Sequence, residues 1–288
     1  MDFTNAAELL EQCEKQQLSI SEVMEEREMT VGEASRQTIN ERMARVIQIM
    51  EKSTHHPIEH AQKSIGGLIG GEAKLIDLYA KERAPICGMT LSKAIAYAMA
   101  VLEVNATMGL IVAAPTAGSS GVVPGALIAI QEAYQLSQEE LQRGLMNTSA
   151  VGYLLMRNAS VSGAEAGCQA EVGSASAMAA SGIVEMLGGT PGMCMQAASM
   201  ALSNLLGLVC DPIAGLVEAP CQGRNAIGVS NAFTSAQLAL SGVRHPIPFD
   251  EMAAAMYKVG RSLPFELRET AMGGNAGTPT GCTFCLQK

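Results

Sequence analysis

The pattern of hydrophobic and polar residues predicts amphipathic helices along the first ninety residues. Between Gln37 and Glu51, apolar residues recur at spacings of three and four, which gives a helix one apolar face; they are Ile39, Met43, Val46, Ile47 and Met50. Three segments fit a capping box, in which a hydroxyl and a carboxylate bind the free amides of a helix start: Ser19–Glu22, Thr30–Glu33 and Ser137–Glu140. Pro57 and the glycine pairs that follow it predict turns, so the first helices end there.

Beyond Lys93 the predicted helices no longer have a polar face. Residues 94–142 and 158–223 contain neither Lys nor Arg, and long runs of Ala, Gly, Ser, Met and Leu predict helices that are packed on all sides. The run "GLIVAAP" is the one short strand-like segment. We therefore expect an all-α fold: a single large helical domain over 1–288, with Gly/Pro-rich loops, a helical scaffold over 1–60 and a flexible C-terminal tail over 273–288.

Composition and charge narrow the classes of partner. The 288 residues include 19 Lys and Arg against 28 Asp and Glu, a net charge of −9, and no basic cluster follows the chain. Nucleic acid is therefore not an expected partner. The N-terminus lacks the basic and apolar regions of a secretory signal, which indicates a cytoplasmic protein whose eight cysteines are thiols or metal ligands rather than disulfides.

The mean hydropathy of +0.18 raises the possibility of a membrane span. The best candidate is the uncharged run from Met193 to Cys210, which contains Gln196 and Asn204 among other polar residues. It has no flanking Lys or Arg and no aromatic belt, so the sequence favours a buried helix over a membrane span.

Three cysteines stand in or beside Gly/Pro turns inside the cation-free regions: Cys168, Cys210 and Cys221. Turns give a backbone the freedom to direct several thiolates at one metal, yet any single buried cysteine can equally be a small apolar residue. Zinc sites use short CxxC knuckles, and here one such pair, Cys282 and Cys285, stands alone near the C-terminus. The histidines of "HHPIEH" do not have HExxH spacing and are predicted to be solvated loop residues: His55, His56 and His60.

Two further features fit a small anionic substrate. The loop "APTAGSSGVVPG" offers amides and hydroxyls that could cradle a carboxylate, with a tight helical connection as the alternative; its candidate residues are Thr116, Gly118, Ser119 and Ser120. Arg224 and Asn225 follow Cys221 closely, and a guanidinium beside a candidate ligand suits carboxylate capture. Three scattered cysteines on an iron–sulfur cluster would leave one iron open as a Lewis acid, although spacing alone does not establish a cluster.

The motifs "AEAGCQAEVGSASAMAA", "CDPIAGLVEAPCQGRNA", "PTAGSSGVVPG" and "LPFELRETAMGGNAGTPTG" closely resemble the alpha chain of bacterial iron-sulfur-dependent L-serine dehydratase. The resemblance runs from about "GGEAKL" to the C-terminus. It implies an all-helical catalytic unit with a [4Fe-4S] cluster on Cys168, Cys210 and Cys221. It also implies conversion of L-serine to pyruvate and ammonia without pyridoxal phosphate, with the serine hydroxyl and carboxylate on the open iron.

The resemblance carries further expectations. Single-chain relatives have an additional N-terminal portion that in two-chain members is a beta subunit with an ACT-like regulatory region, so an alpha–beta partner and a higher oligomer are expected. The base is either Lys93, whose pKa burial could lower, or a histidine of the partner chain. A tail cysteine, Cys285 or else Cys282, is predicted to occupy the open iron position until serine displaces it, and a disordered tail is the alternative.

Two other classes of protein remain as alternatives. A pyridoxal-phosphate dehydratase would use Lys93 as Schiff base and "TAGSSG" as phosphate loop, but such enzymes are α/β and strand patterns are scarce here. A non-catalytic helical membrane or scaffold protein would use its cysteines structurally and would bind no iron.

Overall fold

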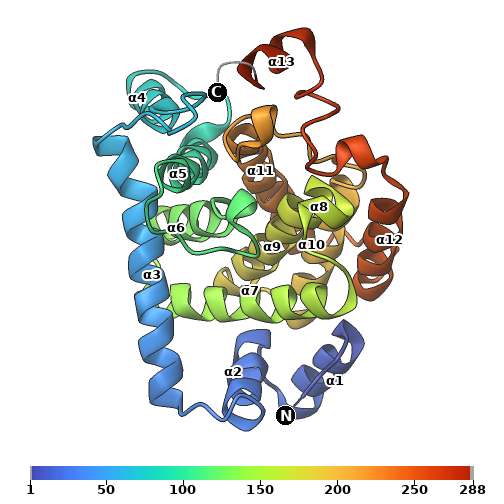
Figure 1. Cartoon of the computed structure of the whole chain (residues 1–288). Coiled ribbons are helices and arrows are strands. Elements are labelled where there is room, and N and C mark those ends of the chain that lie inside the picture. Colours follow the sequence, from blue (N-terminus) through green and yellow to red (C-terminus); the bar gives the residue numbers. More distant parts are fainter. Residues whose placement is uncertain (1, 286–288) are drawn as a thin grey trace.

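Helices make up the regular structure in residues 2–285, the part of the chain that the computed structural model describes, the side chain of Cys285 excepted (Figure 1). The α-helices are α1 Ala6–Gln16, α2 Ile20–Thr30, α3 Arg36–Glu59, α4 Glu72–Glu82, α5 Gly88–Ala106, α6 Val122–Tyr134, α7 Gln138–Asn158, α8 Gly163–Ala166, α9 Ser174–Met186, α10 Pro191–Asn204, α11 Cys221–Leu240, α12 Phe249–Ser262 and α13 Pro279–Cys285. Short 3₁₀ or π turns are η1 Ala117–Ser119, η2 Gln169–Gly173, η3 Ile213–Gly215 and η4 Phe265–Leu267. No strand longer than an isolated bridge occurs in residues 2–285, and the predicted all-α fold is confirmed.

Helix α9 forms the centre of the fold. It packs against α6, α7, α10 and α11, and its small side chains are buried along almost the whole helix (Figure 1). Ala, Ser and Gly let neighbouring helix axes approach closely, so a stretch with little polar character becomes a helix covered on every side. The cation-free sequence is thus the inner layer of the molecule.

Helices α5 and α6 meet through glycine. A Cβ added at Gly121 would lie 2.1 Å from the Ala98 carbonyl oxygen, and one added at Gly125 would lie 2.8 Å from the Ala98 nitrogen. The two helices therefore touch backbone to backbone. This contact fixes the loop before α6, which adjoins the cysteine-bearing segments described below.

The prediction that the chain turns at Pro57 is wrong. Helix α3 continues through Pro57 to Glu59 because the proline lies in the last turn, where it removes one backbone hydrogen bond, and its ring is buried. His55 and His56 consequently stand on a helix rather than in a loop. His56 and His60 are exposed as expected, but His55 is half-buried.

Two of the three predicted capping boxes are confirmed. Ser19 caps α2 and Ser137 caps α7, each with the glutamate three residues on returning the hydrogen bond. The third prediction, at Thr30, is wrong because Thr30 is the last residue of α2 and Ser35 caps the next helix. A hydroxyl and a carboxylate three residues apart therefore do not by themselves establish a helix start.

The run from Met193 to Cys210 covers all but the first two residues of the mostly buried helix α10, which ends at Asn204. It packs between α9, α11 and α12, as the sequence favoured. Among the helices in residues 2–285, none has the length and apolar character that crossing a membrane requires.

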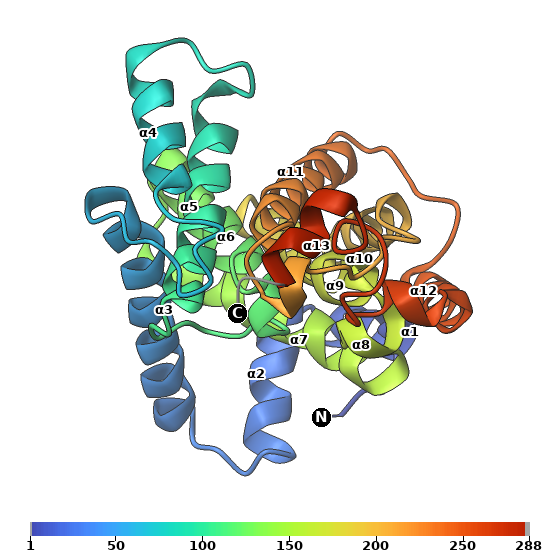
Figure 2. The same cartoon turned by 45° about the horizontal axis from the view of Figure 1, so that its top comes forward.

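Helix α4 and the first half of α5 project from the body as a two-helix arm (Figure 2). We call residues 72–93 the arm. Its exposed large apolar side chains are Leu75, Leu78, Tyr79, Ile86 and Met89, and Ile86 at the tip is 97% exposed.

Candidate metal centre

The three turn-borne cysteines come from separate segments and are all buried. Cys168 precedes η2, Cys210 lies in the extended segment before η3, and Cys221 is the first residue of α11. The Sγ atoms of Cys168 and Cys210 and a carboxylate oxygen of Glu171 lie within 4.8 Å of one another. These three residues form a group that could bind a metal.

Local backbone structure explains how Cys168 and Glu171 reach the same place. The η2 segment is a π turn, a wider turn than an α-helix makes, and it places Glu171 one turn beyond Cys168. Gly167 before it has a φ of +77°, and a side chain there would lie 2.9 Å from the Leu208 carbonyl oxygen. The glycine of the "AGC" motif is therefore required for the Cys168 segment to pack against residues 208–210.

Backbone groups of residues 267–269, which follow α12, hold the Cys210 segment in place. The Cys210 amide donates to the Leu267 carbonyl at 2.9 Å, and the Glu269 amide donates to the Cys210 carbonyl at 2.6 Å. This two-bond bridge joins residues 208–211 to residues 267–269. The "LPFELRE" motif thus serves to anchor one of the candidate ligands.

The electrostatics of the thiols fit a metal centre. The hydrogen bond between Cys168 and Cys210, together with burial, raises the pKa of Cys210. Burial raises the pKa of Cys221 to about 12, with the nearby Cys168 thiol contributing. Thiols this close disfavour one another's ionisation, and a cation among them reverses that preference because it binds the thiolates directly.

Arg224 is held in place by this centre. Its Nη2 lies 2.5 Å from Asp211 Oδ1, and its Nη1 donates to the Val209 carbonyl at 2.7 Å. Burial opposes the guanidinium charge, but the Cys168 thiol and Asp211 outweigh burial and raise the pKa of Arg224. The sequence predicted that Arg224 binds a substrate carboxylate, and in the structure its guanidinium is paired with the buried Asp211.

The predicted substrate loop adjoins the centre through one side chain. Thr116 Oγ1 donates to Glu171 Oε1 at 2.7 Å. Ser119 and Ser120 are fully buried, and the Ser120 hydroxyl donates to the Ala117 carbonyl at 2.8 Å. Asn225 joins the loop to α11, because its Nδ2 donates to the Gly118 carbonyl and its Oδ1 accepts from the Gly121 amide.

Lys93 belongs to a different cluster. Its Nζ lies 2.9 Å from Glu132 Oε2, and Tyr97 and His55 bind the same carboxylate. Glu132 stands near the far end of α6 from the substrate loop, about 15 Å along the helix from Val122 at 1.5 Å per residue. The contacts found in residues 2–285 do not bring Lys93 to the cysteines.

The tail residues meet the centre through Asn275. Its backbone amide and its Nδ2 both donate to Asp211 Oδ2, at 2.6 and 2.9 Å. The Cys282 thiol is exposed and points at the Ala276 carbonyl, 3.6 Å away. The predicted tail segment contains the short helix α13, which packs against η3, while the side chain of Cys285 lies outside the described residues.

Three buried acids were missed by sequence reasoning, and each stands within three residues of a cysteine: Glu171, Asp211 and Glu218. Glu218 accepts hydrogen bonds from the Ser64 hydroxyl and from the Gly66 and Leu68 amides, and so orders the Gly-rich loop before α4. Their closeness to the cysteines in sequence was the available signal. An acid that stands close in sequence to each of several buried cysteines is a candidate for burial near them.

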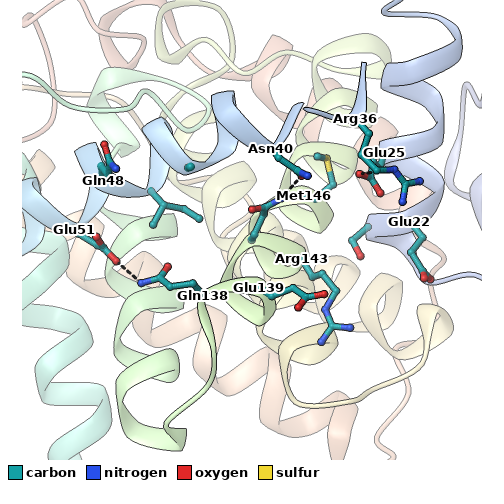
Figure 3. A pocket seen from close by; sticks show the side chains of 14 residues that line it. Glu22, Glu25, Arg36, Asn40, Gln48, Glu51, Gln138, Glu139, Arg143 and Met146 are labelled. Carbon is teal, nitrogen blue, oxygen red and sulfur yellow. Dashed lines mark hydrogen bonds and ion pairs between the residues drawn. The ribbon is translucent and has the colours of Figure 1, made fainter. Parts of the chain in front are cut away.

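A cavity of about 770 Å³ lies elsewhere, between α2, α3 and α7 (Figure 3). Several of its polar side chains are paired with one another across it: Gln138 donates to Glu51, and Arg36 lies 3.5 Å from Glu25. The cavity shares no residue with the cysteine centre. The cavity and the group of potential metal ligands therefore lie in different parts of the molecule. We take the cysteine centre as the candidate site because it holds the thiols and the buried charges.

Comparison with known proteins identifies the family. The serine dehydratase alpha chain family matches residues 15–276. The chain is 47% identical to a probable L-serine dehydratase, alpha chain, of Bacillus subtilis, over 97% of this chain and 93% of that one. It is 45% identical to the L-serine dehydratase, alpha chain, of Peptoniphilus asaccharolyticus, over 97% and 96%. It is 36% identical to the L-serine dehydratase TdcG of Escherichia coli, and the matched region covers 96% of this chain but 62% of the relative. The chain belongs to the serine dehydratase alpha chain family.

Proposed function

We propose that this chain is the catalytic alpha chain of an L-serine dehydratase, a lyase that converts L-serine to pyruvate and ammonia. The observation that carries the proposal is the meeting of buried cysteines from separate motifs, with a buried acid and a buried arginine, in a chain of this family. Relatives that carry this name occur in several bacteria.

The cofactor of the proposal is a [4Fe-4S] cluster held by Cys168, Cys210 and Cys221. All three thiols are buried on turn-borne segments. The hydrogen bond with Cys168 together with burial raises the pKa of Cys210, and burial raises the pKa of Cys221, as fits thiols that ionise only with a cation beside them. When bound, a cluster with three protein thiolates supplies an iron with an open position, which acts as a Lewis acid toward a hydroxyl leaving group.

The protein's own residues have distinct parts in this proposal. Arg224, fixed by Asp211, keeps a positive charge beside Cys168 and offsets the charge of the thiolates. Thr116 donates a hydrogen bond to Glu171 at the centre. Gly118, Ser119, Ser120 and Asn225 hold the loop in shape through their buried hydrogen bonds. The loop is thus arranged before substrate arrives.

For the base that removes the Cα proton, we favour a histidine of the partner chain over Lys93. Lys93 forms an ion pair with Glu132 in a cluster away from the cysteines. A base must come within hydrogen-bond reach of the proton it abstracts. The occupation of the open iron position by Cys285 or Cys282 likewise stays a prediction.

The proposal includes a beta partner with an ACT-like region, a higher oligomer and a cytoplasmic location. Two relatives are named as alpha chains, and this chain covers 62% of the relative from Escherichia coli. The exposed apolar side chains of the arm support the existence of a protein partner, because exposed apolar surface marks interaction sites. The described cysteines are free thiols, in keeping with a reducing compartment.

The test is anaerobic expression with and without the partner chain, followed by iron and sulfide analysis and a pyruvate assay. Replacing Cys168, Cys210 or Cys221 singly with alanine is expected to abolish iron loading and pyruvate formation, because each removes a ligand. Cys13→Ala is the matched control, since Cys13 is also buried but lies on α1. Full iron content in any one of the three variants would remove that residue from the ligand set.

The same protein distinguishes the alternatives. A broad absorbance that is lost in air, with iron and sulfide in equal amounts, supports the cluster. A band that borohydride shifts would indicate pyridoxal phosphate instead, and a single metal ion without sulfide would indicate a mononuclear site built on the Cys168, Glu171 and Cys210 group.

A further inference from the structure

We infer that Glu171 binds the α-ammonium group of the substrate, an inference that rests on the function proposed above. L-Serine carries three polar groups, a carboxylate, a hydroxyl and an ammonium. Cations and Lewis acids serve the first two, whereas a buried ammonium needs an anionic acceptor to replace its water. The acceptor must therefore be a carboxylate at the centre that has an oxygen free to bind the ammonium.

Glu171 lies inside the centre. Its carboxylate belongs to the group with Cys168 and Cys210, and the residue is only 9% exposed. Oε1 accepts the Thr116 hydroxyl at 2.7 Å, whereas Oε2 has one weak contact, 3.8 Å from the Cys210 thiol. Oε2 therefore keeps acceptor capacity beside the candidate ligands.

The other buried acids near the cysteines are already committed. Asp211 binds Arg224 with one oxygen and Asn275 with the other. Glu218 receives three hydrogen bonds from the loop of residues 64–68. Neither has an oxygen to offer without breaking contacts that shape the site, so the assignment falls to Glu171.

The carboxylate of Glu171 is also fixed in direction. A Cβ at Gly163 would lie 2.4 Å from Oε2, and one at Gly118 would lie 3.1 Å from Oε1. Two glycines thus close around the group, and the Thr116 hydroxyl sets its rotation. A binding group whose position is set before substrate arrives loses little entropy on binding.

Glu269 is the rival acceptor. Its charge acts on Glu171 and Cys210, and its amide is bound to the Cys210 carbonyl. Its side chain, however, is exposed, where water screens an ion pair and weakens it. Glu269→Gln is therefore the matched control, because it removes the same charge close to the same cysteine.

The experiment compares two ligands on the cluster-loaded enzyme, isolated with its partner chain. L-Serine carries the ammonium, while 3-hydroxypropanoate keeps the carboxylate and the hydroxyl and lacks it. Binding of each is followed by the change in the cluster's visible spectrum, alongside KM and kcat for serine. Glu171→Gln is expected to weaken serine binding roughly 10- to 100-fold, as expected for loss of a charged hydrogen bond, and to leave 3-hydroxypropanoate binding unchanged.

Several outcomes would overturn the assignment: equal weakening of both ligands, no weakening of serine, or a serine-selective loss in Glu269→Gln but not in Glu171→Gln. If Glu171→Gln fails to take up iron, Thr116→Val decides, because it removes the hydroxyl that orients the carboxylate and keeps the charge. A smaller serine-selective loss in Thr116→Val supports the inference, and no selective loss overturns it.

Failure of the proposed function has a different signature. It would appear in the unmodified enzyme as absent sulfide or absent pyruvate formation. A wild-type enzyme that passes both assays, followed by a non-selective Glu171→Gln, would reject the ammonium site alone.

Discussion

The buried carboxylate of Asp211 joins two segments that lie 64 residues apart in sequence. It pairs with Arg224 on α11 and accepts two hydrogen bonds from Asn275. A side chain at Gly274 would collide with it, 2.1 Å from Oδ2, and the φ of Gly274 is +58°. The glycine-rich "GGNAG" motif thus fits closely over the acid that follows Cys210.

Asp211→Asn is expected to destabilise the protein by about 3 kcal/mol, because it leaves the Arg224 charge buried without its partner. The measurement is urea unfolding followed by circular dichroism. Asp77→Asn is the control, since Asp77 pairs with the exposed Lys81 and should cost about 0.5 kcal/mol or less. Equal midpoints for the two variants would contradict the importance given to the buried pair.

The sequence singled out the cysteines as candidate ligands but not the acids that lie near them. Cys168, Cys210 and Cys221 stand out because thiols in Gly/Pro turns are unusual and because their motifs are long. Glu171 and Asp211 look like ordinary charged residues, which are usually solvated, until the fold brings Thr116 and Asn275 to them. Lys93 shows the converse: its place before an apolar run suggested a buried base, but tertiary contacts pair it with Glu132.

At the scale of elements, small residues decide how closely the inner helices pack. Gly125→Ala is expected to destabilise the protein by about 1–3 kcal/mol, because its Cβ would lie 2.8–2.9 Å from the backbone of α5. Chemical denaturation measures the change. Gly192→Ala, on α10 with its nearest neighbour atom at 3.8 Å, should stabilise by up to about 1 kcal/mol. A Gly125→Ala variant as stable as wild type would show that α5 and α6 can separate freely.

Helix content was predictable from pattern, but two helix ends were not. A run of small residues without Lys or Arg has few alternatives to a buried helix, so α9 and α10 followed from composition. The turn expected at Pro57 failed because a proline in a last turn costs one hydrogen bond, and burial of its ring against neighbours offsets that loss. Such compensation is tertiary and leaves no local mark in the sequence.

Across the whole molecule, one carboxylate ties three helices together. Glu132 on α6 binds His55 on α3 and both Lys93 and Tyr97 on α5. Burial alone would raise the pKa of Glu132, but hydrogen bonds from His55, Lys93 and Tyr97 lower it to about 2. The cluster therefore holds the long helix α3 against the body (Figure 1).

This cluster predicts that the free energy of unfolding falls at acid pH, a decrease that we call the acid limb. A carboxylate whose pKa is depressed in the folded state stabilises that state above its ordinary pKa of 4.5 and loses the contribution as pH falls toward 2. We expect a loss of about 2 kcal/mol over that range after allowance for solvent screening at this partly exposed site. Thermal unfolding at a series of pH values measures it. Glu132→Gln should be less stable at pH 6 and should flatten the acid limb, and an unchanged pH profile in that variant would contradict the assignment.

The bridge between Cys210 and residues 267–269 also sets an order of events during synthesis. The ribosome delivers Cys168, Cys210 and Cys221 well before it delivers Leu267 and Glu269, whose backbone groups hold the Cys210 segment. The segment that carries this thiol therefore stays without its fixed backbone while the nascent chain is still growing past α12. Ordering of the Cys210 segment is then a late event, because its backbone partners exist only after residues 267–269 have been synthesised.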